Sequence, residues 1–78
     1  MSFDLEGADP LYLQLSAELE KRILEGIYPP GKKIPSAVEL AEEFGVSRKT
    51  VNDALRIVKT RGLLRGVPGR GTFVVDRT

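Results

Sequence analysis

The 78-residue sequence contains no cysteine, no histidine and no tryptophan. Without cysteine it cannot form disulfides, and without cysteine or histidine it cannot build a zinc finger or use histidine as a catalytic base. It has no nucleophile elbow and no convincing carboxylate pair, so we expect no enzyme, no cofactor and no metal. It also lacks an apolar run long enough for a signal peptide or a membrane span, and the absence of cysteine suits a reducing cytoplasm.

The net charge of +1 conceals a division of charge along the chain. Residues 1–43 carry four Lys and Arg against nine Asp and Glu, whereas residues 44–78 carry eight against two. The first part therefore has a net charge of −5 and the second a net charge of +6. Such a cationic half is typical of a protein that binds a polyanion, although small domains also show this asymmetry by chance.

Residues 36–55 predict two short helices joined by a turn. Ser36 and Glu39 have the spacing of a capping box, so a helix should begin at Ala37, and Gly45 should end it in a left-handed conformation. Ser47 is a candidate N-cap for the second helix. That helix has an apolar stripe at helical spacing, formed by Val51, Ala54, Leu55 and Val58. Its opposite face, which we expect to meet a partner, carries Arg48, Lys49, Asn52, Asp53, Arg56 and Lys59.

A first helix and a loop precede this pair. Asp9 should cap the first helix and Pro10 should occupy its first position, since a proline there gives up no hydrogen bond. The helix should end at Gly26 and turn an apolar stripe toward the later helices. Residues 27–35 then form a loop in which Ile34 closes the core edge and could pair with a later strand. The two lysines of the loop could reach phosphate, although charged residues in exposed loops are usually only solvated.

A β-hairpin should follow the last helix, which we expect to end at Gly62. The tip, residues 66–71, has the proline and glycines of a tight turn, and residues 72–75 are rich in residues that favour strands. Alternate residues of this second strand should face the core. The expected fold is therefore mainly α, with three helices followed by a small hairpin.

Several short motifs of the chain recur together in one family of proteins. They are Pro10-Leu11-Tyr12 with Gln14, Gly26, Pro30-Gly31, Ile34-Pro35-Ser36, Glu39-Leu40-Ala41, Gly45-Val46-Ser47-Arg48, Thr50-Val51, Ala54-Leu55, Gly62-Leu63 and Gly69-Arg70-Gly71-Thr72-Phe73-Val74. In order and spacing they resemble the N-terminal winged helix-turn-helix domain of the GntR family of bacterial transcription regulators. The resemblance implies an N-terminal arm over residues 1–9, a winged helix-turn-helix DNA-binding domain over residues 10–76, and no effector-binding domain in this chain.

The resemblance implies a repressor that binds double-stranded operator DNA in the bacterial cytoplasm, without contact with a membrane. A recognition helix at about residues 47–61 would enter the major groove, and a wing at about residues 63–75 would lie at the adjacent minor groove. Family members typically form homodimers, which we expect on DNA or in a full-length regulator. The candidate DNA contacts are Ser36, Ser47, Arg48, Lys49, Thr50, Asn52, Arg56, Gly69, Arg70, Gly71 and Thr72.

The chemistry of these side chains agrees with such a role. Arg48, at the start of the second helix of the pair, can donate bidentately to guanine, and Asn52 can pair with adenine. Thr50 is a better candidate for phosphate than Ser47, whose hydroxyl is needed for capping. Glycines on both sides of Arg70 allow the backbone to approach a groove closely, where the arginine meets the negative potential of the minor groove.

Some residues depart from what this role leads us to expect. Family members commonly have glutamate and arginine after the serine, where this chain has Ala37-Val38, and an arginine where it has Asn52. The missing arginines are DNA contacts in the family pattern, so either the operator differs or base-specific affinity is lower. Asp53 would repel DNA unless it accepts from cytosine, and its pairing with Lys49 or Arg56 within the helix is the simpler explanation.

A winged helix that binds a protein is the main alternative. It predicts large exposed apolar residues on the wing or the recognition face, and only Val38 and Val67 favour it. The chain is either part of a longer regulator or a naturally short member of the family.

Overall fold

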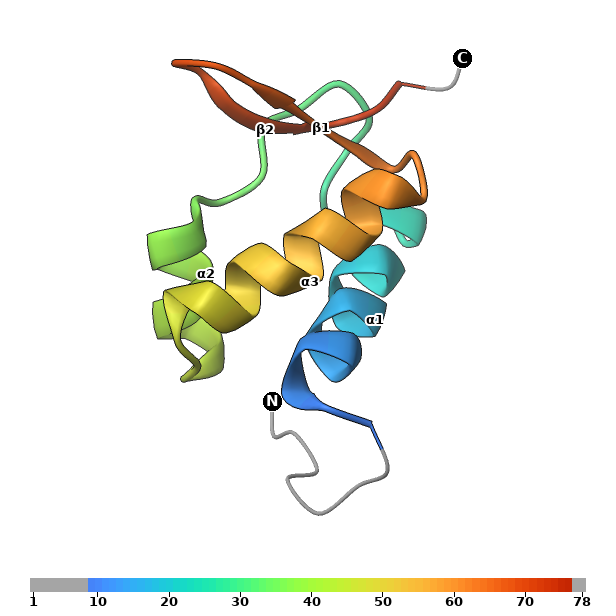
Figure 1. Ribbon diagram of the computed structural model, residues 1–78. Helices are drawn as coiled ribbons and strands as arrows, with labels where there is room; N and C mark the ends of the chain where they lie inside the picture. Colours follow the sequence, from blue (N-terminus) through green and yellow to red (C-terminus); the bar gives the residue numbers. More distant parts are fainter. Residues whose placement is uncertain (1–8, 77–78) are drawn as a thin grey trace.

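The computed structural model describes residues 9–76 of the chain. Three helices are followed by two strands, as the sequence predicts: α1 (Leu11–Leu24), α2 (Ala37–Phe44), α3 (Arg48–Thr60), β1 (Leu64–Val67) and β2 (Gly71–Val74) (Figure 1). The N-terminal arm expected at residues 1–9 lies outside the described residues except for Asp9.

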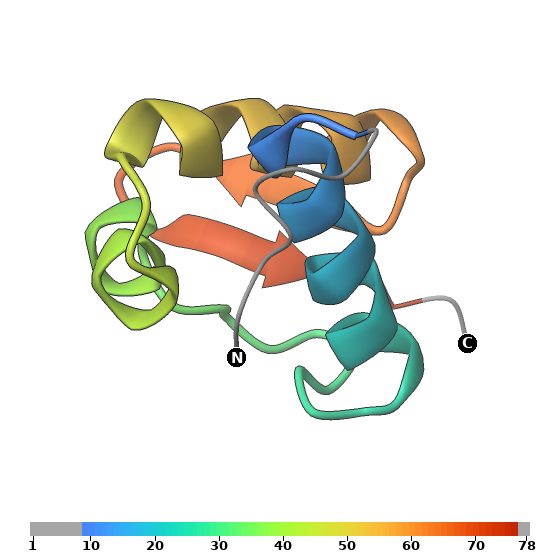
Figure 2. The same cartoon turned by 90° about the horizontal axis from the view of Figure 1, so that it is seen from below.

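The third helix, α3, is the central element of the fold. It packs against α1, α2 and β1, and the hairpin lies across one end of the helices (Figure 1). In Figure 2, α1 and α2 lie on opposite sides of the view, and the segment leading into α2 runs beside β2. Apolar side chains from all three helices fill the space between them, and the largest fully buried ones are Leu15, Leu19, Leu40, Val51 and Val58. One face of α3 is thereby buried, which leaves its opposite face outside.

The start of α1 differs from the expectation by one residue. Pro10 is the N-cap, with an extended ψ of 157°, and the helix begins at Leu11. No side chain caps it, so the capping role predicted for Asp9 is wrong. Asp9 contributes its backbone carbonyl instead, which accepts a hydrogen bond of 2.8 Å from Gln14 Nε2. The extended ψ of Pro10 explains the shift, because a residue with helical φ but not helical ψ can precede a helix without belonging to it.

The caps of α2 and α3 are confirmed. The backbone N–H of Glu39 donates to Ser36 Oγ, and the N–H of Ser36 donates to Glu39 Oε1, each over 3.1 Å. Gly45 ends α2 with a φ of 67°, in the left-handed region. Ser47 then caps α3 by accepting from the backbone of Thr50. Both helices of the pair are therefore fixed at their starts by local hydrogen bonds.

The hairpin is antiparallel, and the loop before α2 pairs with its second strand. Ile34 donates its N–H to the carbonyl of Thr72, and Val74 donates to the carbonyl of Lys32, both over 2.9 Å. The side chain of Ile34 is buried, which confirms that it closes the core. The turn of the hairpin is shorter than the expected tip, because only residues 68–70 lie outside the two strands. The wing is thereby tied by its backbone to the segment that enters α2.

A guanidinium-centred cluster joins α1 to α2. Arg22 contacts Glu43 over 2.6 Å and Glu18 over 3.3 Å, and it donates to the hydroxyl of Tyr28 over 2.7 Å. Its guanidinium carbon lies 4.6 Å from the centroid of the Phe44 ring, within the range of a cation–π contact. The hydrogen bond to Glu43 is the main reason that the pKa of Arg22 is raised, and burial raises the pKa of Tyr28. The arginine therefore stays charged and the phenol stays neutral well beyond neutral pH.

Candidate nucleic-acid interface

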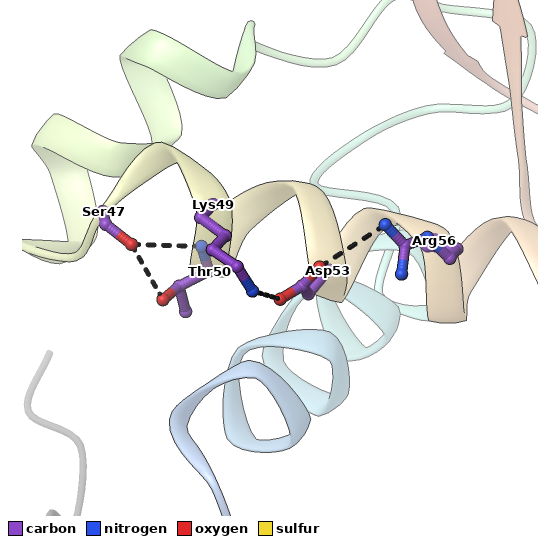
Figure 3. Close-up of polar contacts among 5 residues, drawn as sticks. All are labelled: Ser47, Lys49, Thr50, Asp53 and Arg56. Atoms are coloured by element: carbon purple, nitrogen blue, oxygen red, sulfur yellow. Dashed lines mark hydrogen bonds and ion pairs between the residues drawn. The ribbon is translucent and has the colours of Figure 1, made fainter.

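The outer face of α3 carries a row of three paired charges (Figure 3). Lys49 Nζ lies 3.1 Å from one carboxylate oxygen of Asp53, and Arg56 Nη2 lies 3.5 Å from the other. This confirms the intrahelical pairing expected for Asp53, with both cations at once. The two cationic side chains are 85% and 76% exposed, so the pairs contribute little to stability and their cations stay accessible to a partner.

The N-terminal end of α3 is held by two hydroxyl groups (Figure 3). Ser47 Oγ accepts from the backbone N–H of Thr50 over 3.1 Å and lies 3.0 Å from Thr50 Oγ1. One of the two hydroxyls donates its proton in this contact, so the proton of the accepting hydroxyl stays available to a further acceptor. Arg48 is the first residue of the helix, and it is exposed.

A hollow of about 690 Å³ lies between α3 and the start of α2. Its α3 side is formed by candidate contacts together with Asp53, and its α2 side by Ala37 and Val38. The candidates that line it are Arg48, Lys49, Asn52 and Arg56. The fold therefore brings the four candidates of the helix face together, as the periodicity predicts.

A second, open groove of about 680 Å³ lies between the wing and the segment that enters α2. Residues 33–37 form one wall and residues 66–72 the other. Among its lining residues are the candidates Ser36, Gly69, Arg70, Gly71 and Thr72. Ala37 belongs to both linings, so this groove adjoins the hollow beside α3. Ser47 and Thr50 line neither of them.

The backbone of the wing tip requires glycine. Gly69 has a φ of 74° and Gly71 a φ of 121°, values that other residues rarely adopt. Arg70 stands exposed between them, and its N–H closes the turn on the carbonyl of Val67 over 2.9 Å. The guanidinium of Arg70 is therefore carried on a tight turn.

Lys33 also lines the wing groove, although the sequence alone gave no reason to distinguish it from the neighbouring Lys32. The missing signal was the pairing of this loop with β2, which determines the direction of each side chain. The pKa of the Glu39 carboxyl is lowered chiefly by the hydrogen bond that the Ser36 backbone N–H donates to it, then by the Ser36 side chain, and Lys33 adds a smaller electrostatic effect. In the part of the chain that is described, no helix has both the length and the apolar character needed to cross a membrane.

Three helices with a recognition face on the third, followed by a hairpin, define a winged helix-turn-helix domain. The sequence matches the family model described as "Bacterial regulatory proteins, gntR family" over residues 11–74. The chain belongs to the GntR family.

Named relatives include bacterial repressors. The chain is 40% identical over 74 residues to the HTH-type transcriptional repressor NagR of Bacillus subtilis, covering 95% of this chain and 30% of the relative. It is 42% identical over 71 residues to the histidine utilization repressor of Pseudomonas putida, covering 91% of this chain and 29% of the relative. The chain thus spans less than a third of the length of these relatives.

Solved structures show the same fold. The DNA-binding domain of AraR in complex with operator ORE1 superimposes with a TM-score of 0.84 at 40% identity, covering 94% of this chain and 89% of that one. YtrA from Sulfolobus acidocaldarius, a GntR-family transcription factor, gives a TM-score of 0.85 at 35% identity, covering 96% and 79%.

Proposed function

We propose that this chain is the DNA-binding module of a transcriptional repressor, which acts by occupying an operator. In this arrangement α3 enters the major groove and the wing lies at the adjacent minor groove. The observation that carries the proposal is the pair of adjoining hollows, which gathers the cations of α3 and the wing on one surface. Supporting it, two relatives are repressors, and the similar DNA-binding domain of AraR forms a complex with operator ORE1.

Each candidate has a role that its position supports. Arg48, at the exposed start of α3, reads guanine through two hydrogen bonds, and Asn52 reads adenine. Arg70 enters the minor groove, where negative potential is strongest. The remaining candidates contact the sugar-phosphate backbone, and they are Ser36, Ser47, Lys49, Thr50, Arg56, Gly69, Gly71 and Thr72.

The departures from the family pattern give this module its own operator preference. Val38 borders the hollow beside α3, where the family commonly places a charged residue, and Asn52 also lines it. An asparagine at this position favours adenine, whereas an arginine favours guanine. We therefore propose an operator that carries adenine where arginine-bearing relatives would select guanine.

The partner is a double-stranded operator with two half-sites, bound by a homodimer in the bacterial cytoplasm. Helix-turn-helix proteins commonly bind as dimers, because a single small domain makes few contacts and two half-sites double them. We assign no effector site to residues 9–76.

A titration with duplex DNA at several salt concentrations tests the proposal. Binding should weaken steeply as salt rises, since each neutralised phosphate contributes about −0.9 to the slope of log K against log salt. Arg48→Ala should cost about 1–3 kcal/mol at the preferred site and relax base preference. Arg61→Ala is the matched control, because Arg61 is exposed near the end of α3 but pairs with Glu20 of α1 over 2.9 Å.

Two results would overturn the proposal. If the chain bound no duplex at any salt, the surface would serve a protein partner instead. Exposed apolar residues argue against that outcome, because of the four large ones among residues 9–76 only Val38 borders the interface. If Arg48→Ala and Arg61→Ala discriminated equally well between sites, the base-reading role of Arg48 would be wrong.

A further inference from the structure

Lys33 is an exposed residue beside the wing. Its residue forms an antiparallel bridge with Phe73 of β2, so the two side chains lie on the same side of the paired strands. Successive residues of an extended segment point to opposite sides, and the next one, Ile34, is buried in the core. Lys33 therefore lies on the side of the paired strands opposite to Ile34 and lines the wing groove, whereas its neighbour Lys32 is directed to the other side.

Gly71 leaves room for the lysine to cross the wing. A Cβ atom built on Gly71 would lie 2.6 Å from Cε of Lys33 and 3.4 Å from its Nζ, so a side chain there would collide with the lysine stem. The end of the lysine side chain thus lies over Gly71, the residue that follows Arg70.

If the module binds DNA as proposed above, the groove that Lys33 lines would lie on the path of one DNA strand. A helix in the major groove and a wing in the adjacent minor groove are separated by the sugar-phosphate strand that divides these grooves. On this protein, the surface between α3 and the wing tip includes the groove between residues 33–37 and residues 66–72. A strand that followed this surface would pass the side chain of Lys33.

The carboxylate of Glu39 does not prevent this contact. Glu39 is close enough for Lys33 to lower its pKa, but one of its carboxylate oxygens is committed to the N–H of Ser36 in the capping box. A lysine ammonium has three donors, and it can serve Glu39 and a phosphate together.

Building on the function proposed above, we propose that Lys33, laid over Gly71, binds the phosphate backbone of the strand that passes between α3 and the wing. This contact carries no base preference, and it fixes the wing against DNA. It adds to the interface a residue from outside both the recognition helix and the hairpin.

Lys33→Ala and Lys32→Ala form a matched pair that tests the proposal. They remove the same charge from adjacent positions, so a difference between them reports position and not net charge. Binding to a mixture of random duplexes and to a selected operator is measured between 50 and 200 mM salt. Loss of one phosphate contact reduces the magnitude of the salt slope by about 0.9, so wild type should lose about 3.5-fold more affinity than Lys33→Ala over this range. Lys32→Ala should retain the wild-type slope.

Further variants keep the outcomes distinct. Lys33→Arg should restore the slope, because it keeps the charge and the donors, and thermal unfolding of each variant checks that the fold is intact. A wild-type slope in Lys33→Ala, or equal changes in both alanine variants, would overturn this inference and leave the DNA-binding function standing. Absence of binding by the wild-type chain would overturn the proposed function itself. A loss confined to the operator would also contradict the inference, since a backbone contact affects all sequences alike.

Discussion

Replacing Arg22 by methionine should destabilise the domain severely, although this residue lies away from the proposed DNA surface. Methionine preserves much of the aliphatic stem, but it removes every polar contact of the guanidinium. Arg22 has a side chain only 15% exposed and bridges Glu43, Glu18 and the Tyr28 hydroxyl. The substitution therefore isolates the electrostatic part of the cluster.

The expected loss follows from the separate contacts. Leaving the half-buried Tyr28 hydroxyl without its donor costs about 1–2 kcal/mol. The ion pair with Glu43, whose side chain is 46% exposed, contributes about 0.5–1 kcal/mol. The contact with the Phe44 ring adds about 0.5–1 kcal/mol. The free energy of unfolding should fall by about 2–4 kcal/mol, which is a large part of the total for so small a domain.

Urea unfolding followed by circular dichroism measures this loss, with the slope m checked for constancy. Lys21→Met is the matched control, because Lys21 is the exposed neighbour on the same helix, and it should change stability by less than about 0.5 kcal/mol. In the double mutant with Tyr28→Phe, the two losses should not add, since the shared hydrogen bond is removed only once. A loss below about 0.5 kcal/mol in Arg22→Met, within the range of the surface control, would refute the reasoning.

The other predictions concern the interface and the caps. Asp53→Asn should raise affinity for random duplexes by about two- to fivefold, because it releases two exposed cations from weak pairs; a lower affinity would show that the carboxylate orients them instead. Ser36→Ala should lower the free energy of unfolding by about 0.5–2 kcal/mol in urea titrations, and a loss below that range would show that the Ser36 cap does not stabilise the domain as argued. Folding lowers the pKa of Glu39, so its ionised carboxylate stabilises the domain above the ordinary glutamate pKa of ~4.3, and this stabilisation is lost as the pH falls through the lower folded pKa. Unfolding followed from pH 7 to pH 2 should show this loss of stability, and Ser36→Ala should make the loss smaller. Gly45→Ala should cost about 1 kcal/mol through backbone strain alone, since nothing lies within 4 Å of the added methyl group, and an unchanged melting temperature would contradict this.

Features determined by neighbouring residues could be predicted from the sequence, and features that depend on distant contacts could not. The capping box of Ser36 and the left-handed Gly45 were predictable because their hydrogen bonds and φ values are local. The outer face of α3 was predictable because helical periodicity alone separates it from the core. The start of α1 was missed by one residue, since proline is compatible with both the N-cap and the first helical position.

The Arg22 cluster and the Lys33 position show where sequence reasoning stops. Arg22 meets Glu43, which is far from it along the chain and on another helix, so no spacing rule could pair them. Lys33 differs from its neighbour only through the bridge to Phe73. The contiguity of the hollow beside α3 with the wing groove likewise required the tertiary fold. The side chains that one helix or strand exposes can therefore be predicted from the sequence, but the contacts between different elements cannot.

The backbone pairing between β2 and the loop before α2 has a consequence for how such a module can diversify. These hydrogen bonds run between main-chain atoms, from Ile34 to Thr72 and from Val74 to Lys32, so they do not depend on which side chains the neighbouring surface displays. Substitutions on the outer face of α3 can therefore alter base preference without breaking the main-chain bonds that tie the wing to the loop before α2. New specificities can therefore arise one residue at a time, without remodelling of the scaffold.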